Sequence, residues 1–161
     1  MGWVEGCSTI SDDIQEPGVG GVFYDPASGI LEGFVHQLTD EEQKEALREQ
    51  TLSVPWIEIL GAVLWMELYA GRCEASRVLL ALDADTATQA LARAFSADAD
   101  MLQLIQRYRR KAAEFFVMLR VRSVVGEWAN RVADHLSHFR VQDAIVLAWT
   151  MFGKELVVRR L

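Results

Sequence analysis

The sequence predicts an α/β domain built on a mixed sheet. Three observations support this class. Short β-prone runs separated by turn residues fill the first 35 positions. Helical periodicity then alternates with two further strand-length apolar runs. The length of 161 residues with 51% apolar content suits one compact domain with a sizeable core.

Three strands are expected first. Gly and Pro punctuate the runs between them, and the turn at residues 25–29 combines a proline with a glycine that tolerates positive φ. The short connections predict an antiparallel meander. The three predicted strands are residues 7–12, 19–24 and 30–35.

Helices follow at residue 39. Thr39 and Glu42 match a capping box that opens a polar helix reaching about residue 50. Ser53 stands before Pro55, an accepted first-turn residue, and predicts a long apolar helix over 55–70. Residues 77–82 form a continuous apolar run typical of a strand buried on both faces.

After residue 86 the sequence predicts four helices and one strand. Thr86 and Gln89 match a second capping box, which predicts a helix from about residue 87. The further predicted elements are a helix over 87–95, a helix over 98–115, a strand over 117–122, a helix over 129–137 and a last helix over 141–152.

Several protein classes are disfavoured. The longest apolar stretch, residues 144–152, is too short to cross a bilayer, and no secretory signal is visible, so no membrane partner is expected. Cys7 and Cys73 stand far apart without a CxxC pair. This usage fits a reducing compartment, and we expect an intracellular protein of the cytoplasm or nucleus.

Charge is distributed unevenly. The net charge of −7 alone argues against a nucleic-acid partner. Residues 1–100, however, carry 18 acids and five bases, whereas residues 101–161 carry five acids and eleven bases. Such asymmetry indicates an interaction surface in the second part.

Four carboxylates are candidates for one site, although the helix dipole alone also favours an acid at Glu58. Asp12 and Asp83 each end a predicted strand, where an isolated charge is costly. Glu58 lies in the first turn of the apolar helix, and Asp134 shares a helix face with Asn130 at i, i+4. Clustered carboxylates repel one another, so a cluster predicts bound Mg²⁺ or Mn²⁺. Two such ions are a recurring device for phosphodiester hydrolysis.

Four sequence blocks carry a family resemblance. The blocks are residues 11–13 (SDD) with 18–22 (GVGGV), 58–62 (EILGA), 78–83 (VLLALD) and 126–137 (GEWANRVADHLS). They resemble the ribonuclease H (RNase H) superfamily, especially the RNase H-like domains of tyrosine-recombinase retroelement reverse transcriptases. The resemblance implies an RNase H-like fold with a five-stranded mixed sheet and helices on both faces. It covers about residues 8–139, which gives a domain over 1–139 and a helical extension over 140–161.

The resemblance implies a site and an activity. Asp12 would bridge two Mg²⁺ or Mn²⁺ ions, Glu58 and Asp83 would hold the ion near the leaving group, and Asp134 the ion that activates water. The implied activity is endonucleolytic hydrolysis of the RNA strand in an RNA/DNA hybrid. Recognition would rest on minor-groove shape and 2′-hydroxyls. An adjacent reverse transcriptase domain is a further expected partner.

Departures from the family pattern keep two alternatives open. Asp13 and Ile14 follow Asp12 in place of a small residue and Ser, and Ala84 follows Asp83 in place of Asn or Ser. Residues 122–127 hold no histidine where many members carry one. A non-catalytic scaffold of a polymerase is therefore an alternative. A DNA nuclease or integrase-like enzyme on the same fold is another.

A basic run lies between the third and fourth blocks. We expect nucleic-acid contacts there and at the fourth block, although such a run also suits a solvated helix face. Tyr108 within the run either stacks on a base or packs in the core. The candidate nucleic-acid-binding residues are Arg107, Arg109, Arg110, Lys111, Arg122 and Asn130.

Overall fold

The computed structural model describes all residues except 1–2, 12, 14, 49 and 124–127. The main helices and strands follow the predicted order, but the first helix ends at Ala46 rather than near residue 50, and the short strand Leu47–Arg48 then pairs antiparallel with Thr51–Leu52. The strands are β1 (Val4–Ser11), β2 (Gly18–Asp25), β3 (Ile30–Gln37), β4 (Leu47–Arg48), β5 (Thr51–Leu52), β6 (Arg77–Leu82), β7 (Met118–Ser123) and β8 (Val157–Arg160). The helices are α1 (Asp40–Ala46), α2 (Val54–Tyr69), a 3₁₀ turn η1 (Ala70–Cys73), α3 (Asp85–Arg93), α4 (Ala99–Glu114), α5 (Trp128–Ser137) and α6 (Val141–Phe152).

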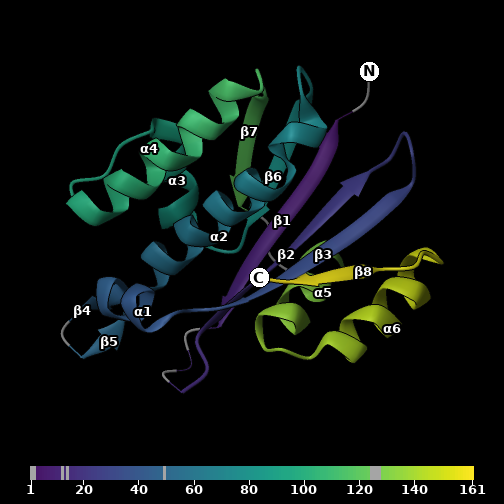
Figure 1. The fold of residues 1–161 in the computed structure, drawn as a ribbon, viewed down its shortest axis with the longest axis horizontal. Coiled ribbons are helices and arrows are strands. Elements are labelled where there is room, and N and C mark those ends of the chain that lie inside the picture. The colour runs from purple at the N-terminus through teal and green to yellow at the C-terminus, as the bar shows by residue number, and fades with distance from the viewer. Residues whose placement is uncertain (1–2, 12, 14, 49, 124–127) are drawn as a thin grey trace.

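Among the described residues, six strands form one mixed sheet in the order β7-β6-β1-β2-β3-β8 (Figure 1). The first three strands make the expected antiparallel meander. Strand β6 pairs parallel with β1, β7 parallel with β6, and β8 parallel with β3. Because β1 and β6 run in the same direction, their carboxyl ends lie at one edge of the sheet.

Helices cover both faces of this sheet, as expected for an α/β domain (Figure 1). The larger core lies between the sheet and α2, α3 and α4. The second core lies between the sheet and α5 and α6. Helix α2 is buried on nearly all sides because it packs between β1 and β2 on one side and α4 on the other.

The continuous helical stretch Val54–Cys73 is long and apolar enough to cross a membrane by length and composition, the one such helix in the described part of the chain. Within the protein, however, 67% of its apolar window is buried. Its apolarity is therefore accounted for by its place in the larger core.

Two of the three predicted helix starts are confirmed. The Thr39 hydroxyl accepts from the Glu42 amide, and the Glu42 side chain accepts from the Thr39 amide, which completes the capping box. Ser53 caps α2 through the Trp56 amide. The capping box at Thr86 is wrong because α3 already begins at Asp85, after Ala84. Asp85 is thus a first-turn acid favoured by the helix dipole rather than the cap.

The sixth strand corrects the expected count of five. Gly153 adopts a φ of 62° and ends α6. The chain then buries Leu156 and adds β8 beside β3. Residues 140–161 therefore hold a strand as well as the expected helix. The four residues of β8, two of them arginines, are too few and too polar for their hydrophobic pattern to predict a strand.

Helix α5 lies unusually close to the sheet at Gly20 of β2. A β-carbon at this position would stand 2.3 Å from the Ala133 carbonyl oxygen and 2.4 Å from the Ser137 amide nitrogen. Because both atoms belong to the helix backbone, a side chain here can be accommodated only by moving α5. The absence of a side chain at Gly20 thus sets the height of α5 above the sheet.

We expect Gly20→Ala to lower the free energy of unfolding by about 1–3 kcal/mol, the usual cost of overpacking. Urea denaturation followed by tryptophan fluorescence measures the effect. Gly71→Ala is the matched control, since a β-carbon there would meet only the Phe115 ring at 3.6 Å. Equal stability of the two variants would contradict the close approach of α5.

Candidate active site

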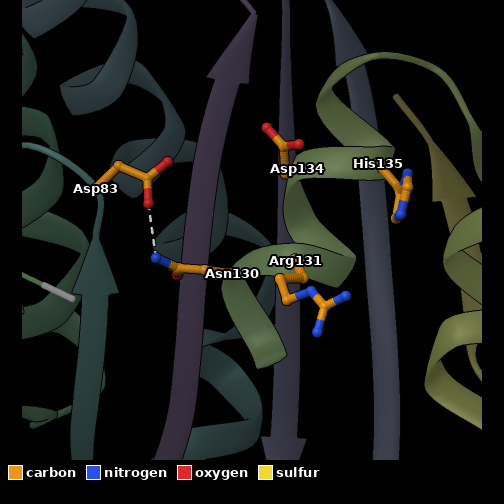
Figure 2. A pocket seen from close by; sticks show the side chains of 5 residues that line it. All are labelled: Asp83, Asn130, Arg131, Asp134 and His135. Atoms are coloured by element: carbon orange, nitrogen blue, oxygen red, sulfur yellow. Dashed lines mark hydrogen bonds between the residues drawn. The ribbon is translucent and has the colours of Figure 1, made fainter. Parts of the chain in front are cut away.

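A pocket opens where β6 ends and α5 passes (Figure 2). Asp83 comes directly after β6, and the four other lining residues belong to α5. Figure 2 shows Asn130 reaching toward Asp83, Asp134 one turn further along α5, and the Arg131 side chain directed away from Asp83. The lining residues are Asp83, Asn130, Arg131, Asp134 and His135.

A hydrogen bond joins the two sides of this pocket. The Asn130 amide nitrogen Nδ2 donates to Asp83 Oδ1 across 2.6 Å. Asn130 is buried whereas Asp83 is exposed, so the bond is partly shielded from water, and the charge of the acceptor strengthens it. It fixes the orientation of one carboxylate oxygen of Asp83 and leaves the other to face the pocket (Figure 2).

Glu58 lies beneath this pair in α2 and is only 4% exposed. Burial, followed by repulsion from Asp83, raises the pKa of its carboxyl from 4.5 to about 7, while a hydrogen bond from the Ala84 backbone opposes the rise. Within the described residues, Glu58 Oε2 is buried without a hydrogen-bond partner. A carboxylate oxygen that is buried without a partner is stable only if it binds a proton or a cation, because an unpaired buried charge is costly.

Asp83 is itself repelled by a third acid, Asp134. Burial, and then the negative charge of Asp134, raises the pKa of the Asp83 carboxyl. Asp134 is about half exposed and has basic neighbours: His138 Nε2 lies 3.6 Å from one oxygen and Arg140 3.9 Å from the other. Asp83 thus repels Glu58, and Asp134 repels Asp83, so the three acids form a series that runs from α2 past the end of β6 to α5.

The chemistry of this donor set suits a hard divalent cation, because all three groups offer oxygen and two are destabilised by their negative charge. The spacing is wide. Among the described residues, no group of three acids, histidines or cysteines is close enough together to hold an ion. The fourth predicted ligand, Asp12, lies outside the described residues, directly after the last residue of β1.

The other predicted nucleic-acid contacts do not gather at this pocket. Of the six, only Asn130 lines it. Arg107, Arg109, Arg110 and Lys111 lie on α4, which packs against α2, and Arg122 lies on β7. Arg107 pairs with Glu67 of α2 at 2.5 Å, and Lys111 pairs with Glu114 at 3.1 Å.

Of the two roles considered for Tyr108, base stacking and core packing, the structure supports core packing. Its side chain is 2% exposed and belongs to the larger core. Base stacking by Tyr108 is therefore excluded in this conformation, because a stacking ring must be exposed. The next two residues of α4, Arg109 and Arg110, are exposed.

Arg131 and His135 line the pocket but are absent from the predicted site. They stand one position after Asn130 and Asp134, so the same i, i+4 spacing places them together on the neighbouring strip of α5. This spacing was the sequence signal that could have grouped Arg131 with His135. Residues 122–127, where the sequence resemblance led us to look for a histidine, are described only at Arg122 and Ser123, which belong to β7.

Comparison with known proteins identifies the fold. No family model and no curated protein match the sequence. RNase H1 from the halophilic archaeon Halobacterium salinarum NRC-1 matches with a TM-score of 0.66 and 17% identity, over 88% of this chain and 99% of that chain. The N-terminal RNase H domain of Rv2228c from Mycobacterium tuberculosis, solved as a fusion with maltose-binding protein, matches with a TM-score of 0.65 and 13% identity, over 86% and 98%.

A third solved structure, LC11-RNase H1 isolated from compost by a metagenomic approach, matches with a TM-score of 0.63 and 10% identity, over 89% of this chain and 99% of that chain. All three share the arrangement of nearly the whole domain. The chain therefore has the ribonuclease H fold, as the four sequence blocks predicted.

The raised pKa of Glu58 predicts a pH-dependent stability. The folded protein holds a proton on Glu58 up to about pH 7, whereas the unfolded chain releases it near pH 4.5. Stability should therefore fall as pH rises through this window, by about 3 kcal/mol if the whole shift is expressed.

Urea denaturation at pH 5 and pH 8 measures this difference. Glu58→Gln should be more stable than the wild type at pH 8 and should lose most of the pH dependence. Glu16→Gln, which changes an exposed acid in the loop after β1, is the control and should leave the dependence intact. An unchanged dependence in Glu58→Gln would contradict the burial of a strained carboxylate.

Proposed function

We propose that this chain is a metal-dependent endoribonuclease that hydrolyses the RNA strand of RNA/DNA hybrids. The observation that carries the proposal is the series Glu58, Asp83 and Asp134, contributed by α2, the end of β6 and α5 of an RNase H fold. The raised pKa values of Glu58 and Asp83 support a functional site here, because perturbed pKa values cluster at such sites.

The proposed ligands of two Mg²⁺ or Mn²⁺ ions are Asp12, Glu58, Asp83 and Asp134. When bound, such ions activate water and stabilise the leaving oxygen of an in-line displacement. The protein's own residues prepare the site. Asn130 holds one Asp83 oxygen in place by its hydrogen bond. Glu58 must be deprotonated to bind a cation, so its raised pKa predicts a cation affinity that increases with pH around pH 7.

We further propose that the domain works beside a reverse transcriptase domain of a retroelement. The tail helix α6 supports this context, because it is buried on the side facing α5 and exposes apolar side chains on the other. Val146 is 55% exposed and Trp149 63% exposed. An exposed aromatic and aliphatic strip of this kind is typical of an interface with another domain.

Two observations favour a second candidate function, a non-catalytic scaffold of a polymerase. Among the described residues, which leave out Asp12, no group of three acids, histidines or cysteines is arranged to hold an ion. In addition, the basic groups of His138 and Arg140 already lie near Asp134. A scaffold would keep the fold without binding metal, which separates the two candidates experimentally.

Cleavage of a labelled RNA/DNA hybrid in Mg²⁺ or Mn²⁺ tests the proposed activity. Asp83→Asn should lower the rate by at least about a hundredfold, because loss of a ligand exceeds the effect of losing an outer partner. Asp85→Asn is the matched control, since it removes an exposed acid two residues away, in the first turn of α3. No cleavage by the wild type, or equal loss in both variants, would refute the nuclease. Duplex DNA in place of the hybrid tests a DNA nuclease.

Metal binding can be measured without activity. Saturating Mn²⁺ at about 100 times its Kd should stabilise the wild type by about 2.7 kcal/mol, which raises Tm by about 5–10 °C. Asp83→Asn should show little of this shift. Calorimetric titration gives the number of ions bound. A wild-type Tm that does not respond to Mn²⁺ would favour the scaffold.

The exposed arginines of α4 predict a salt-dependent contact with the hybrid. Arg109→Ala combined with Arg110→Ala should reduce the slope of log affinity against log salt by about 1–2, one unit for each lost phosphate contact. Anisotropy titrations at several salt concentrations measure the slope. Arg93→Ala, which removes an exposed arginine from α3, is the control. An unchanged slope in the double variant would show that this run is a solvated face.

A further inference from the structure

Strand β7 forms one edge of the sheet, and among the described residues no strand pairs with its outer side (Figure 1). The Met118 amide donates to the Ser76 carbonyl at 2.9 Å, on the β6 side. Backbone groups of successive strand residues point to opposite sides. Arg120 and Arg122 therefore also bond toward β6, whereas the backbone groups of Leu119 and Val121 face the open edge.

Two hollows flank this edge strand, one on each face of the sheet. The first is lined by side chains of α3 and α4 together with Leu119, Arg120 and Val121. The second, on the opposite face, is lined by Trp3, Glu5, Leu79, Arg120 and Arg122. Arg120 lines both hollows, so the two meet at β7. A strand added beside β7 would place its alternate side chains in the two hollows.

The chemistry of the two hollows differs. On the helix face, Leu119 and Val121 are half-buried and pack against the larger core. On the other face, Arg120 and Arg122 are exposed, and the Arg77 guanidinium lies 5.9 Å from the centre of the Trp3 ring. A fitting strand would therefore alternate apolar side chains on the helix face with acidic side chains on the arginine face.

Charge disfavours a second copy of this chain as the occupant. Two β7 strands paired at their edges would bring their arginines together, and like charges on neighbouring strands are destabilising. The other edge strand, β8, carries Arg159 and Arg160 and would meet the same repulsion. Exposed charges on an edge strand are a known means of preventing self-association.

We propose that the outer edge of β7 binds an extended acidic peptide of a partner protein by strand addition. Backbone hydrogen bonds to Leu119 and Val121 would give affinity, and acidic side chains facing Arg120 would give selectivity. This surface is independent of the proposed nuclease pocket, which lies at the end of β6 and along α5.

Hydrogen exchange provides a direct test on the intact protein. The probe is a fluorescent peptide of sequence Glu-Val-Glu-Leu-Glu-Val, with Lys-Val-Lys-Leu-Lys-Val as its matched opposite. The acidic peptide should slow exchange of the Leu119 and Val121 amides, and leave those of Met118, Arg120 and Arg122, already bonded toward β6, little changed. No added protection at Leu119 and Val121 would overturn the proposal.

Charge reversal tests the selectivity. Arg120→Glu should weaken binding of the acidic peptide about tenfold in anisotropy titrations, because an attractive cross-strand pair becomes repulsive. Arg160→Glu makes the same change on the other edge strand and should leave binding unaltered. Equal weakening by both variants, or tighter binding of the basic peptide, would contradict strand addition at β7. Displacement of the acidic peptide by an RNA/DNA hybrid would instead assign this edge to nucleic acid.

Discussion

The parallel pairing of β6 with β1 determines where chemistry can occur in this molecule. It brings the carboxyl ends of two central strands to one edge of the sheet, where Asp83 follows β6. Helix α2 reaches this edge from one face with Glu58, and α5 reaches it from the other with Asn130 and Asp134. Without this pairing, acids that are far apart in the sequence would not influence one another's ionisation.

Close backbone contact then fixes the geometry of the edge. Helix α5 rests on Gly20, and the hydrogen bond from Asn130 to Asp83 ties it to the end of β6. A site built on a helix and strand ends held in this way is more rigid than one built on loops. The cost is electrostatic, because the same packing that orders the carboxylates also removes them from water.

Much of this arrangement could be predicted from the sequence. Periodicity located the elements, and the caps at Thr39 and Ser53 marked two helix starts correctly. Strand β8 could not be foreseen because its stability comes from pairing with β3, a distant partner, rather than from its own pattern. The i, i+4 spacing of Arg131 and His135 places them together on α5, but only the rotation of α5 over the sheet decides that they line the pocket. The buried position of Tyr108, within a basic run, likewise followed from tertiary packing.

The buried carboxyl of Glu58 has an evolutionary consequence. It is 4% exposed and repelled by Asp83, so an amide or an apolar residue at this position would favour the folded state at neutral pH. Mutations that improve stability at no functional cost are readily accepted once an activity is no longer selected. A lineage that had abandoned catalysis would therefore gain by replacing this residue. The ionised carboxyl of Glu58 thus lowers the stability of the folded chain at neutral pH, a cost that the packing of the core does not require.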